Sequence, residues 1–353
     1  MAHGGFGQKH RPQTTRRMAS GGLTRRQWLT RAAGATAVVT AGGFPWVRRA
    51  HAATRTVSLF IGTTPDYANI YVARDKGFLE AEGLKLDIRL FPSGSAATDA
   101  YRSGKVEFVA SGDIPAIRLW KAMGTKLIAP TSYDGFSPVF MVKSAIKGPE
   151  DLKGKTLATR IGSSGEFFVQ LVRQKYDLPA DAFKLINLEP PDMVAVLERG
   201  DIDGFFWFSP FEERSMQISG SKVRLFLRGG EVGYNNEVAL STRADLIQNE
   251  PDTIIRFLRG LIKGSDYAMS HKEETTDIVA AAIKLERKSA EVTQKMNFPV
   301  RFDERLYRYY YNVSKFLVAK KMVDQPVDFD SFFWTKGVGS VDPARVEKMA
   351  ASY

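Results

Sequence analysis

The amino-acid sequence predicts an α/β fold of two lobes with a ligand cleft between them and a helical C-terminal region. Three observations support this prediction. Short apolar segments alternate with helical segments from Thr56 onward, which is typical of βαβ units. The same alternation restarts near Ser137-Pro138, which indicates a second lobe. Beyond Ser241 the pattern is helical almost to the end of the chain.

The first lobe is predicted to contain four strands rich in apolar and β-branched residues. These strands are Thr56–Ile61, Leu84–Phe91, Lys105–Ala110 and Leu127–Thr131. The helices between them end at glycine or begin at capping residues. They are expected at Tyr67–Glu82, Ser93–Arg102 and Ala116–Met123. Strands joined in this way by helices predict a mainly parallel sheet.

The second series follows the same rhythm and is predicted to form the other lobe. Its strands are expected at Val139–Val142, Thr156–Ile161, Leu185–Leu188, Asp201–Phe208 and Val223–Leu227, with a short extended segment at Val238–Ser241. Its helices are expected at Glu166–Tyr176, at Pro190–Gly200 and from Ser209 onward, with Ser209 as the N-cap and Pro210 in the first turn of the last helix. We therefore predict that residues 53–137 and 237–353 form lobe 1 and that residues 138–236 form lobe 2.

The C-terminal region shows apolar residues at helical spacing. Pro251–Met269 carries such a stripe, and Leu306, Tyr310, Val313 and Leu317 repeat it. The tyrosine-rich run Tyr307–Tyr311 lies within the second stripe. We expect these tyrosines to serve packing rather than ligand binding.

Residues 1–52 have the pattern of a twin-arginine-type signal peptide. Arg25-Arg26 precede sixteen uncharged residues, Ala32 to Val47, and Ala50-His51-Ala52 then forms an A-x-A cleavage pattern. The uncharged run is too weakly apolar and too short to span a bilayer, which takes about 20 apolar residues. Export to the periplasm is therefore expected, and an uncleaved amphipathic anchor is the alternative.

Charge and composition exclude several classes of function. The leader holds nine of the 50 Lys and Arg residues, which leaves 41 basic against 39 acidic residues and a net charge of +2. A nucleic-acid-binding surface is therefore not expected. The chain has no cysteine, and His271 is the only histidine beyond residue 52. A Ser-His-Asp triad, a histidine-rich metal site and a bound cofactor are likewise not expected.

Four polar loops follow predicted strands and mark the candidate site. They are Gly62–Asp66, Ser111–Asp113, Gly162–Gly165 and Trp207–Pro210. Open α/β sheets bind ligands beyond the carboxyl ends of their strands. The turn containing Gly162, Ser163 and Ser164 precedes a helix N-terminus, whose unpaired amides suit an anion.

The other candidate residues come from the facing loops. Hydroxyl groups are expected from Thr63, Thr64, Ser111 and Ser137. Arg160 either binds the anion or points to solvent.

Trp207 is expected to form an apolar wall, which suits an organic acid better than an inorganic ion. Asp66 and Asp113 either bind the amine of a zwitterion such as taurine or cap helices. Tyr67 either closes over the ligand or packs.

Several motifs resemble those of the nitrate/sulfonate/taurine-binding proteins of ABC importers, the SsuA/THI5-like family. The residues that carry the resemblance are Ala68–Leu84, Gly104–Ala116, Asp151–Lys155, Leu197–Gly204 and Asn249-Glu250-Pro251. The resemblance implies a type II periplasmic binding fold, in which the chain crosses twice between the lobes. It also implies that ligand is delivered to a membrane ABC permease with a cytoplasmic ATPase. The thiamine-pyrimidine branch is marked by a cysteine-rich motif that this chain lacks, and the cytoplasmic dehydratase-like branch has no export leader.

The expected function is therefore that of a monomeric, exported solute-binding protein without a cofactor. Its ligand is expected to be a small organic anion, with sulfonates, sulfate esters and taurine favoured over aromatic or carboxylic acids, and nitrate and bicarbonate following. The alternative is an exported enzyme on the same fold that uses Asp66 and Glu212 in acid/base catalysis of a small organic acid.

Overall fold

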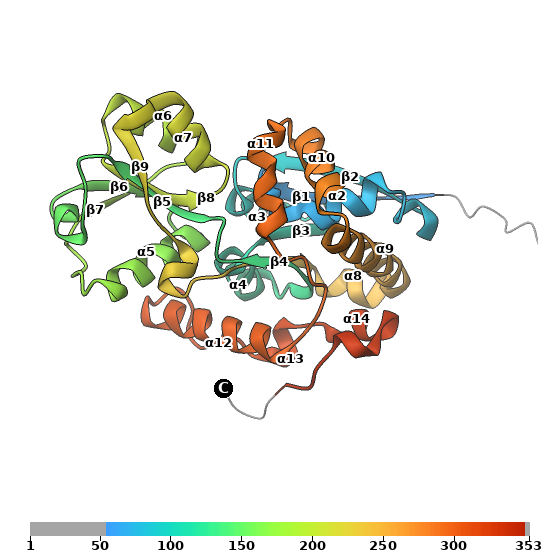
Figure 1. The fold of residues 1–353 in the computed structure, drawn as a ribbon. Helices are drawn as coiled ribbons and strands as arrows, with labels where there is room; N and C mark the ends of the chain where they lie inside the picture. The colour runs from blue at the N-terminus through green and yellow to red at the C-terminus, as the bar shows by residue number, and fades with distance from the viewer. Residues whose placement is uncertain (1–53, 350–353) are drawn as a thin grey trace, which may run out of the picture. The chain divides into compact units, whose positions relative to one another are not determined.

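Two five-stranded mixed sheets form the frame of the structure, a computed structural model that describes residues 54–349 (Figure 1). All described residues belong to one unit, 51–353. The predicted signal peptide lies outside the described residues. Within residues 54–349, no helix combines the length and the apolar character needed to cross a bilayer.

The first sheet has the strand order β2-β1-β3-β10-β4. Its strands are β1 (Arg55–Gly62), β2 (Leu84–Phe91), β3 (Phe108–Gly112), β4 (Lys126–Asp134) and β10 (Asn236–Thr242). Strand β1 is parallel to β2 and β3, whereas β10 is antiparallel to β3 and β4. The associated helices are α2 (Ala68–Asp75), α3 (Gly94–Tyr101) and α4 (Asp113–Met123).

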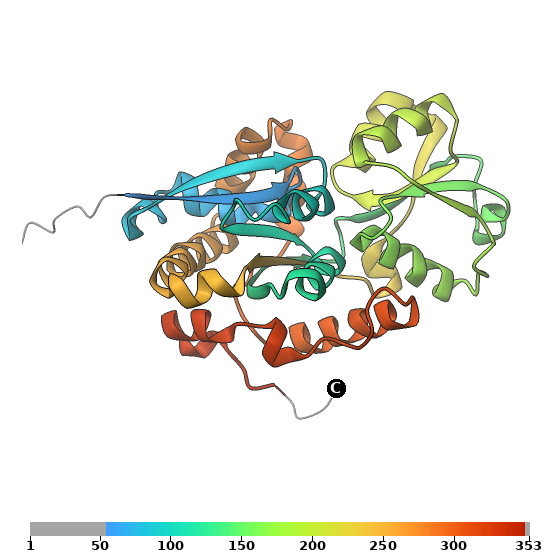
Figure 2. The same ribbon diagram turned by 180° about the vertical axis from the view of Figure 1, so that it is seen from behind.

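The second sheet has the order β7-β6-β8-β5-β9. Its strands are β5 (Pro138–Lys143), β6 (Thr156–Thr159), β7 (Lys184–Asn187), β8 (Gly204–Phe208) and β9 (Val223–Arg228). Helices α6 (Pro190–Arg199) and α7 (Phe211–Ser219) cover one face and α5 (Ser164–Lys175) covers the other (Figures 1 and 2).

Both sheets are mainly parallel, as predicted, but each contains one inserted antiparallel strand that was not predicted. Strand β5 runs antiparallel to both β8 and β9, as β10 does to its neighbours in the first sheet. Each inserted strand follows a connection between the sheets and so enters its sheet from the opposite end. The two connections, residues 135–137 and 229–235, lie side by side, and the Gly230 amide donates to the Gly135 carbonyl at 2.7 Å. The chain therefore crosses twice between the sheets, as the resemblance implies, while the exact lobe boundaries stay a prediction.

Two helices differ from expectation near a glycine or a proline. The predicted helix Tyr67–Glu82 is divided into a 3-10 turn, α2 and a second 3-10 turn at Glu80–Glu82. Gly77 lies just after α2 with a φ of 72°, a conformation that interrupts an α-helix and that glycine adopts without strain. Helix α7 begins at Phe211, so Pro210 precedes the helix instead of lying in its first turn.

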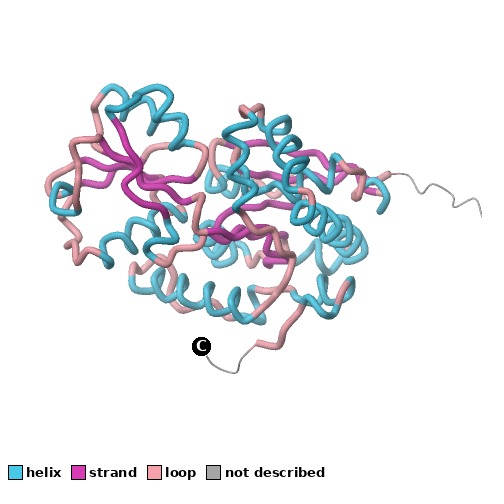
Figure 3. Tube along the Cα trace, viewed as in Figure 1, coloured by secondary structure: helices cyan, strands magenta, loops and turns pink. Residues whose placement is uncertain are grey.

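The C-terminal region is helical, as predicted (Figure 3). Its helices are α8 (Ala244–Asn249), α9 (Pro251–Ser270), α10 (Lys272–Ile283), α11 (Arg287–Ala290), α12 (Glu304–Ala319), α13 (Phe329–Phe332) and α14 (Thr335–Val341). The stripe on α9 is buried at Ile254, Leu258 and Leu261.

Helix α12 contacts both halves of the molecule. All four residues of its predicted stripe are buried, which confirms a packing face. The Tyr309 hydroxyl donates to Asp113 at the start of α4. The ring of Phe316 lies 4.9 Å from that of Phe167 on α5. Helix α12 thus links helices of the two sheets.

Candidate functional site

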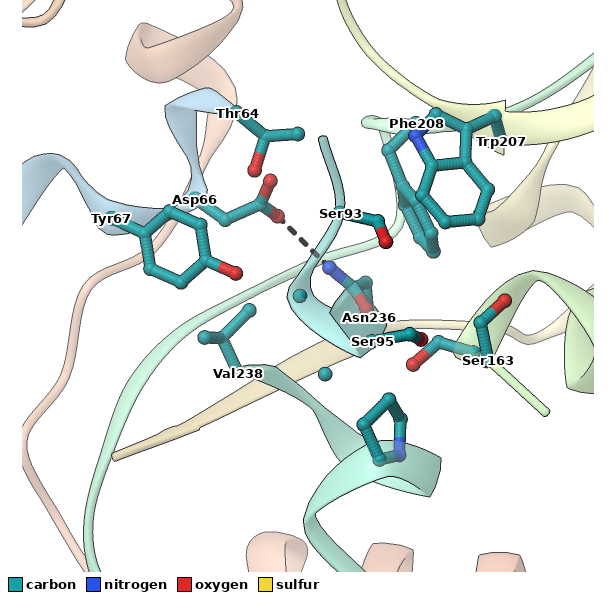
Figure 4. A pocket seen from close by; sticks show the side chains of 14 residues that line it. Thr64, Asp66, Tyr67, Ser93, Ser95, Ser163, Trp207, Phe208, Asn236 and Val238 are labelled. Carbon is teal, nitrogen blue, oxygen red and sulfur yellow. Dashed lines mark hydrogen bonds between the residues drawn. The ribbon is translucent and has the colours of Figure 1, made fainter. Parts of the chain in front are cut away.

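A small polar pocket lies between the two sheets, where several strands end (Figure 4). Its cavity volume is about 40 Å³. Elements of the first sheet contribute Thr64, Asp66, Tyr67, Ser93, Gly94, Ser95, Gly112, Pro115, Asn236 and Val238. Elements of the second sheet contribute Ser163, Ser164, Trp207 and Phe208. We call this cavity the site pocket.

Three helices begin at the site pocket. Their N-cap residues are Ser93 for α3, Gly112 for α4 and Ser163 for α5, and all three line the cavity. A helix N-terminus carries a partial positive charge from its unpaired amides. Three such ends around one cavity favour a negatively charged group there.

The turn at Gly162–Gly165 does not provide the set of free amides that we expected. The Gly162 amide donates to Glu166 Oε2 at 2.8 Å, and the Gly165 amide donates to Ser163 Oγ at 3.1 Å. The Ser163 amide donates to the Arg160 carbonyl at 3.2 Å. Gly162 itself lies outside the site pocket, and its carbonyl accepts a hydrogen bond from Arg118.

Two buried donors in the site pocket have no partner among the described residues. They are the indole Nε1 of Trp207 and the hydroxyl of Ser95. An unpaired buried donor costs about 1–3 kcal/mol, and a ligand acceptor would remove that cost. Trp207 was predicted as an apolar wall, and the structure adds a hydrogen-bond donor to that wall. Ser95 was missed, although the sequence Ser93-Gly94-Ser95 follows a strand and opens a helix.

Asp66 supplies the carboxylate of the site pocket. Its Oδ1 accepts a hydrogen bond from Asn236 Nδ2 at 2.9 Å (Figure 4). Burial raises the pKa of Asp66, and the hydrogen bonds from Thr64 and Asn236 oppose that shift. The group can accept from a ligand amine when ionised or donate to a ligand oxygen when protonated. Asn236 was not predicted, because it begins the inserted strand β10.

Tyr67 lies beside Asp66 and is almost fully buried. Burial raises the pKa of Tyr67, so the phenol stays protonated and can donate a hydrogen bond. Thr64 is also buried in the wall of the site pocket. The structure therefore brings together six of the predicted residues, namely Thr64, Asp66, Tyr67, Ser163, Ser164 and Trp207.

Asp113 lies behind the site pocket in a network that joins the two halves. Its carboxylate accepts hydrogen bonds from Ser164 Oγ, from the Tyr309 hydroxyl and from the Ile114 amide. Burial raises the pKa of Asp113, which these hydrogen bonds oppose. Because the side chain is fully buried and three donors already engage its carboxylate, a capping and bridging role fits this geometry better than binding an amine.

The remaining predicted residues do not line the site pocket. The Thr63 hydroxyl donates to the Phe91 carbonyl at 2.9 Å. Ser111 is buried, and its hydroxyl donates weakly to the Gly112 carbonyl. Ser137 donates to Asp134 Oδ2 at 2.7 Å in the first connection. Arg160 forms an ion pair with Glu189 at 2.7 Å, outside this cavity.

Comparison with known proteins identifies the family. Residues 64–275 match the NMT1/THI5-like family profile, which is more than half of the chain. The chain belongs to the NMT1/THI5-like family. This match spans the residues on which the resemblance depends, and it extends into α10.

Related proteins and structures agree with this assignment. The chain is 24% identical over 234 residues to a Brucella abortus (strain 2308) protein named as a binding protein, covering 64% of this chain and 70% of that one. It is 26% identical over 189 residues to the taurine-binding periplasmic protein of Escherichia coli (strain K12), covering 53% of this chain and 59% of that protein. The alkanesulfonate-binding protein SsuA from Xanthomonas axonopodis pv. citri, bound to MOPS, superposes with a TM-score of 0.68 at 17% identity, covering 80% of this chain and 99% of that chain. The fold is therefore that of periplasmic binding proteins.

The structure does not bring together Asp66 and Glu212, the acid/base pair that we considered for an exported enzyme on the same fold. Asp66 lies in the site pocket, whereas Glu212 lines a different cavity. Glu212 Oε1 accepts from Ser209 at 2.6 Å and pairs with Arg228 at 3.2 Å. Among residues 54–349, no group of three or more His, Cys, Asp or Glu side chains is arranged to hold a metal ion.

Proposed function

We propose that this NMT1/THI5-like protein captures a small organic anion outside the cytoplasm and delivers it to an ABC importer. The observation that carries the proposal is the pair of buried, unpartnered donors, Trp207 Nε1 and Ser95 Oγ, in the site pocket. The start of α3 at Gly94 adds its partial positive charge beside them. The names of the related proteins support a solute-binding role.

The favoured ligands are sulfonates, sulfate esters and taurine. A sulfonate offers three oxygens that can accept from Trp207, from Ser95 and from the amides at the start of α3. The ring of Trp207 supplies an apolar surface for the adjoining carbon atoms. Asp66 lies on the side of the site pocket opposite Trp207 (Figure 4) and suits the ammonium group of taurine.

Ligand capture is proposed to couple to closure of the two lobes. Contacts already join them: Ser164 Oγ donates to Asp113, and Arg118 Nη1 donates to the Gly162 carbonyl at 3.0 Å. The two connections at residues 135–137 and 229–235 form the hinge. The site pocket is small, at about 40 Å³, which supports the proposal that the lobes separate when an organic anion enters.

Localisation and partners follow from the same proposal. The leader at residues 1–52 directs export by the twin-arginine route, and the mature protein acts as a monomer in the periplasm. The partner is a membrane permease with a cytoplasmic ATPase. The chain contains no Walker-type phosphate loop, so ATP hydrolysis belongs to that partner.

A thermal-shift and calorimetry screen tests the proposal. Taurine, short alkanesulfonates, alkyl sulfates and the matching carboxylates are added to the purified mature protein. A true ligand at one hundred times its Kd should stabilise the fold by about 2.7 kcal/mol and be recovered unchanged by mass spectrometry. Chemical conversion of a bound compound would support the enzyme alternative, and the absence of any stabilising anion would contradict the proposal.

The variant Trp207→Phe tests whether the indole N–H of Trp207 donates a hydrogen bond to the ligand. The variant keeps an aromatic wall and removes the indole N–H, so sulfonate affinity should fall by about tenfold to a hundredfold. Trp120→Phe serves as the control, because Trp120 packs against Phe332 away from the site pocket. Equal affinity of the wild type and the Trp207 variant would exclude the indole as a ligand donor.

A further inference from the structure

A second and much larger cavity adjoins the site pocket. Its volume is about 570 Å³, within the range of 300–1,000 Å³ that is typical of organic-ligand sites. Eight of its fourteen lining residues are apolar, and the lining comes from five segments of the chain. The apolar residues include Phe91 and Pro92, Pro210 and Phe211, and Ile283 and Leu285. We call this cavity the apolar groove.

Three stretches of chain contribute neighbouring residues to the apolar groove and to the site pocket. Thr63 lines the groove and Thr64 lines the pocket. In the same way Pro92 is followed by Ser93, and Pro210 lies two residues after Phe208. The two cavities therefore lie on the same three stretches of chain, close enough for one ligand to be proposed to reach both.

The charge of the groove complements an anion. Arg214 and Lys284 line it, and both are exposed. No ion pair joins either side chain to another described residue, whereas Glu286 is the one acidic residue in the lining. The groove therefore combines apolar walls with a surplus of positive charge.

The difference in volume between the two cavities indicates which part of a ligand each could hold. The site pocket, at about 40 Å³, is much smaller than the apolar groove, at about 570 Å³, so it suits the compact part of a ligand. We propose that the ligand is an anion with a compact acidic head in the site pocket and an aromatic body in the apolar groove. This inference rests on the proposed function and specifies its substrate class as aryl sulfonates or aryl carboxylates.

Two matched pairs of compounds test the inference by calorimetry with the mature protein. Methanesulfonate is compared with naphthalene-2-sulfonate, and acetate with 2-naphthoate. Within at least one pair the aromatic member should bind at least about tenfold tighter, because its rings are transferred from water into the apolar groove.

The variant Leu90→Glu distinguishes binding in the apolar groove from binding in the site pocket. Leu90 lines the groove and is 39% exposed, so an acidic side chain there repels the ligand without entering the core. The variant should lose about tenfold in affinity for the aromatic compound and retain its affinity for the small one. Ile218→Glu is the matched control, because Ile218 is 47% exposed and lies outside the groove lining. Arg214→Gln is a second variant, and it should lower the affinity for the aromatic compound severalfold.

The outcomes are distinguishable. Equal affinities within both pairs, or an unaffected Leu90 variant, overturn the groove and leave the proposed function standing. Failure of every sulfonate and carboxylate to bind overturns both. If the Leu90→Glu variant bound every compound as the wild type does but no longer supported uptake in cells, the groove would be a contact surface for a protein partner. That result would overturn the inference.

Discussion

Asp134 illustrates how a buried carboxyl group at the start of the first connection makes stability depend on pH. It ends β4, and its carboxylate accepts hydrogen bonds from the Phe136 amide at 2.7 Å and from the Ser137 amide and hydroxyl. Burial raises the pKa of Asp134 from 3.8 to about 6, with a smaller contribution from the charge of Asp66, and these hydrogen bonds oppose the shift. The group therefore keeps its proton in the folded state at pH values where the unfolded chain has released it.

The sign of the effect on stability follows directly. Below about pH 4 both states hold the proton, so the contribution of Asp134 to stability is fully present. Between about pH 4 and 6 only the unfolded state releases it, and the free energy of unfolding falls by roughly 3 kcal/mol. Asp134→Asn should remove this decline. Urea denaturation at pH 4, 5, 6 and 7 measures it, with the exposed Asp181→Asn as control; an unchanged slope in the Asp134 variant would contradict the assignment.

Site residues were predictable from the sequence where a loop directly follows a strand. Thr64, Asp66 and Tyr67 follow β1, and Trp207 is next to last in β8, so strand-end reasoning placed them in one cavity. The pattern Ser163-x-x-Glu166 is that of a capping box, which predicts that the glutamate reaches back to the amide of Ser163. In the structure Glu166 instead accepts from the amide of Gly162, one residue earlier.

At the scale of elements, the prediction failed for strands that join their sheets from far away in sequence. Local patterns identified both β5 and β10 as extended segments. Their antiparallel insertion depends on pairing with distant strands, which periodicity does not encode. Asn236 lies in the site pocket for that reason alone, because β10 pairs Val238 with Gly112.

Helix α12 offers a test of capping in the C-terminal region. Asp303 is its N-cap, and the carboxylate accepts from the Leu306 amide at 2.8 Å. Asp303→Ala should lower the free energy of unfolding by about 1 kcal/mol, whereas Asp303→Ser should retain most of it because serine also caps. Chemical denaturation of the three proteins checks this order; equal stability of the Ala and Ser variants would show that the cap is not what stabilises α12.

At the scale of the whole molecule, the two lobes meet closely at Gly112. A Cβ at this position would lie 2.2 Å from Ser164 Oγ, which belongs to the opposite lobe. The φ of Gly112 is −62°, so its backbone accepts alanine without strain. The absence of a side chain is therefore required by the approach of the lobes.

Gly112→Ala should weaken ligand binding by about tenfold, because either the lobes stay apart or Ser164 loses its bond to Asp113. Ser164→Ala alone should also weaken binding. The double variant should be little worse than Ser164→Ala, because the two effects share one contact. Calorimetric affinities of the wild type, the two single variants and the double variant measure this coupling. Strictly additive losses would show that Gly112 does not act through its contact with Ser164.

The crossed strands also bear on the order in which the chain can fold during synthesis. Every strand of the second sheet lies between Pro138 and Arg228, so this sheet can form as soon as that stretch has left the ribosome. The first sheet contains the earliest strands, yet β3 and β4 have no common neighbour until residues 236–242 arrive. Until then they present unpaired edges, which are the parts of a nascent chain most prone to wrong pairing. The half of the protein that is made first is therefore the half that is finished last, and a chaperone would have most to protect there.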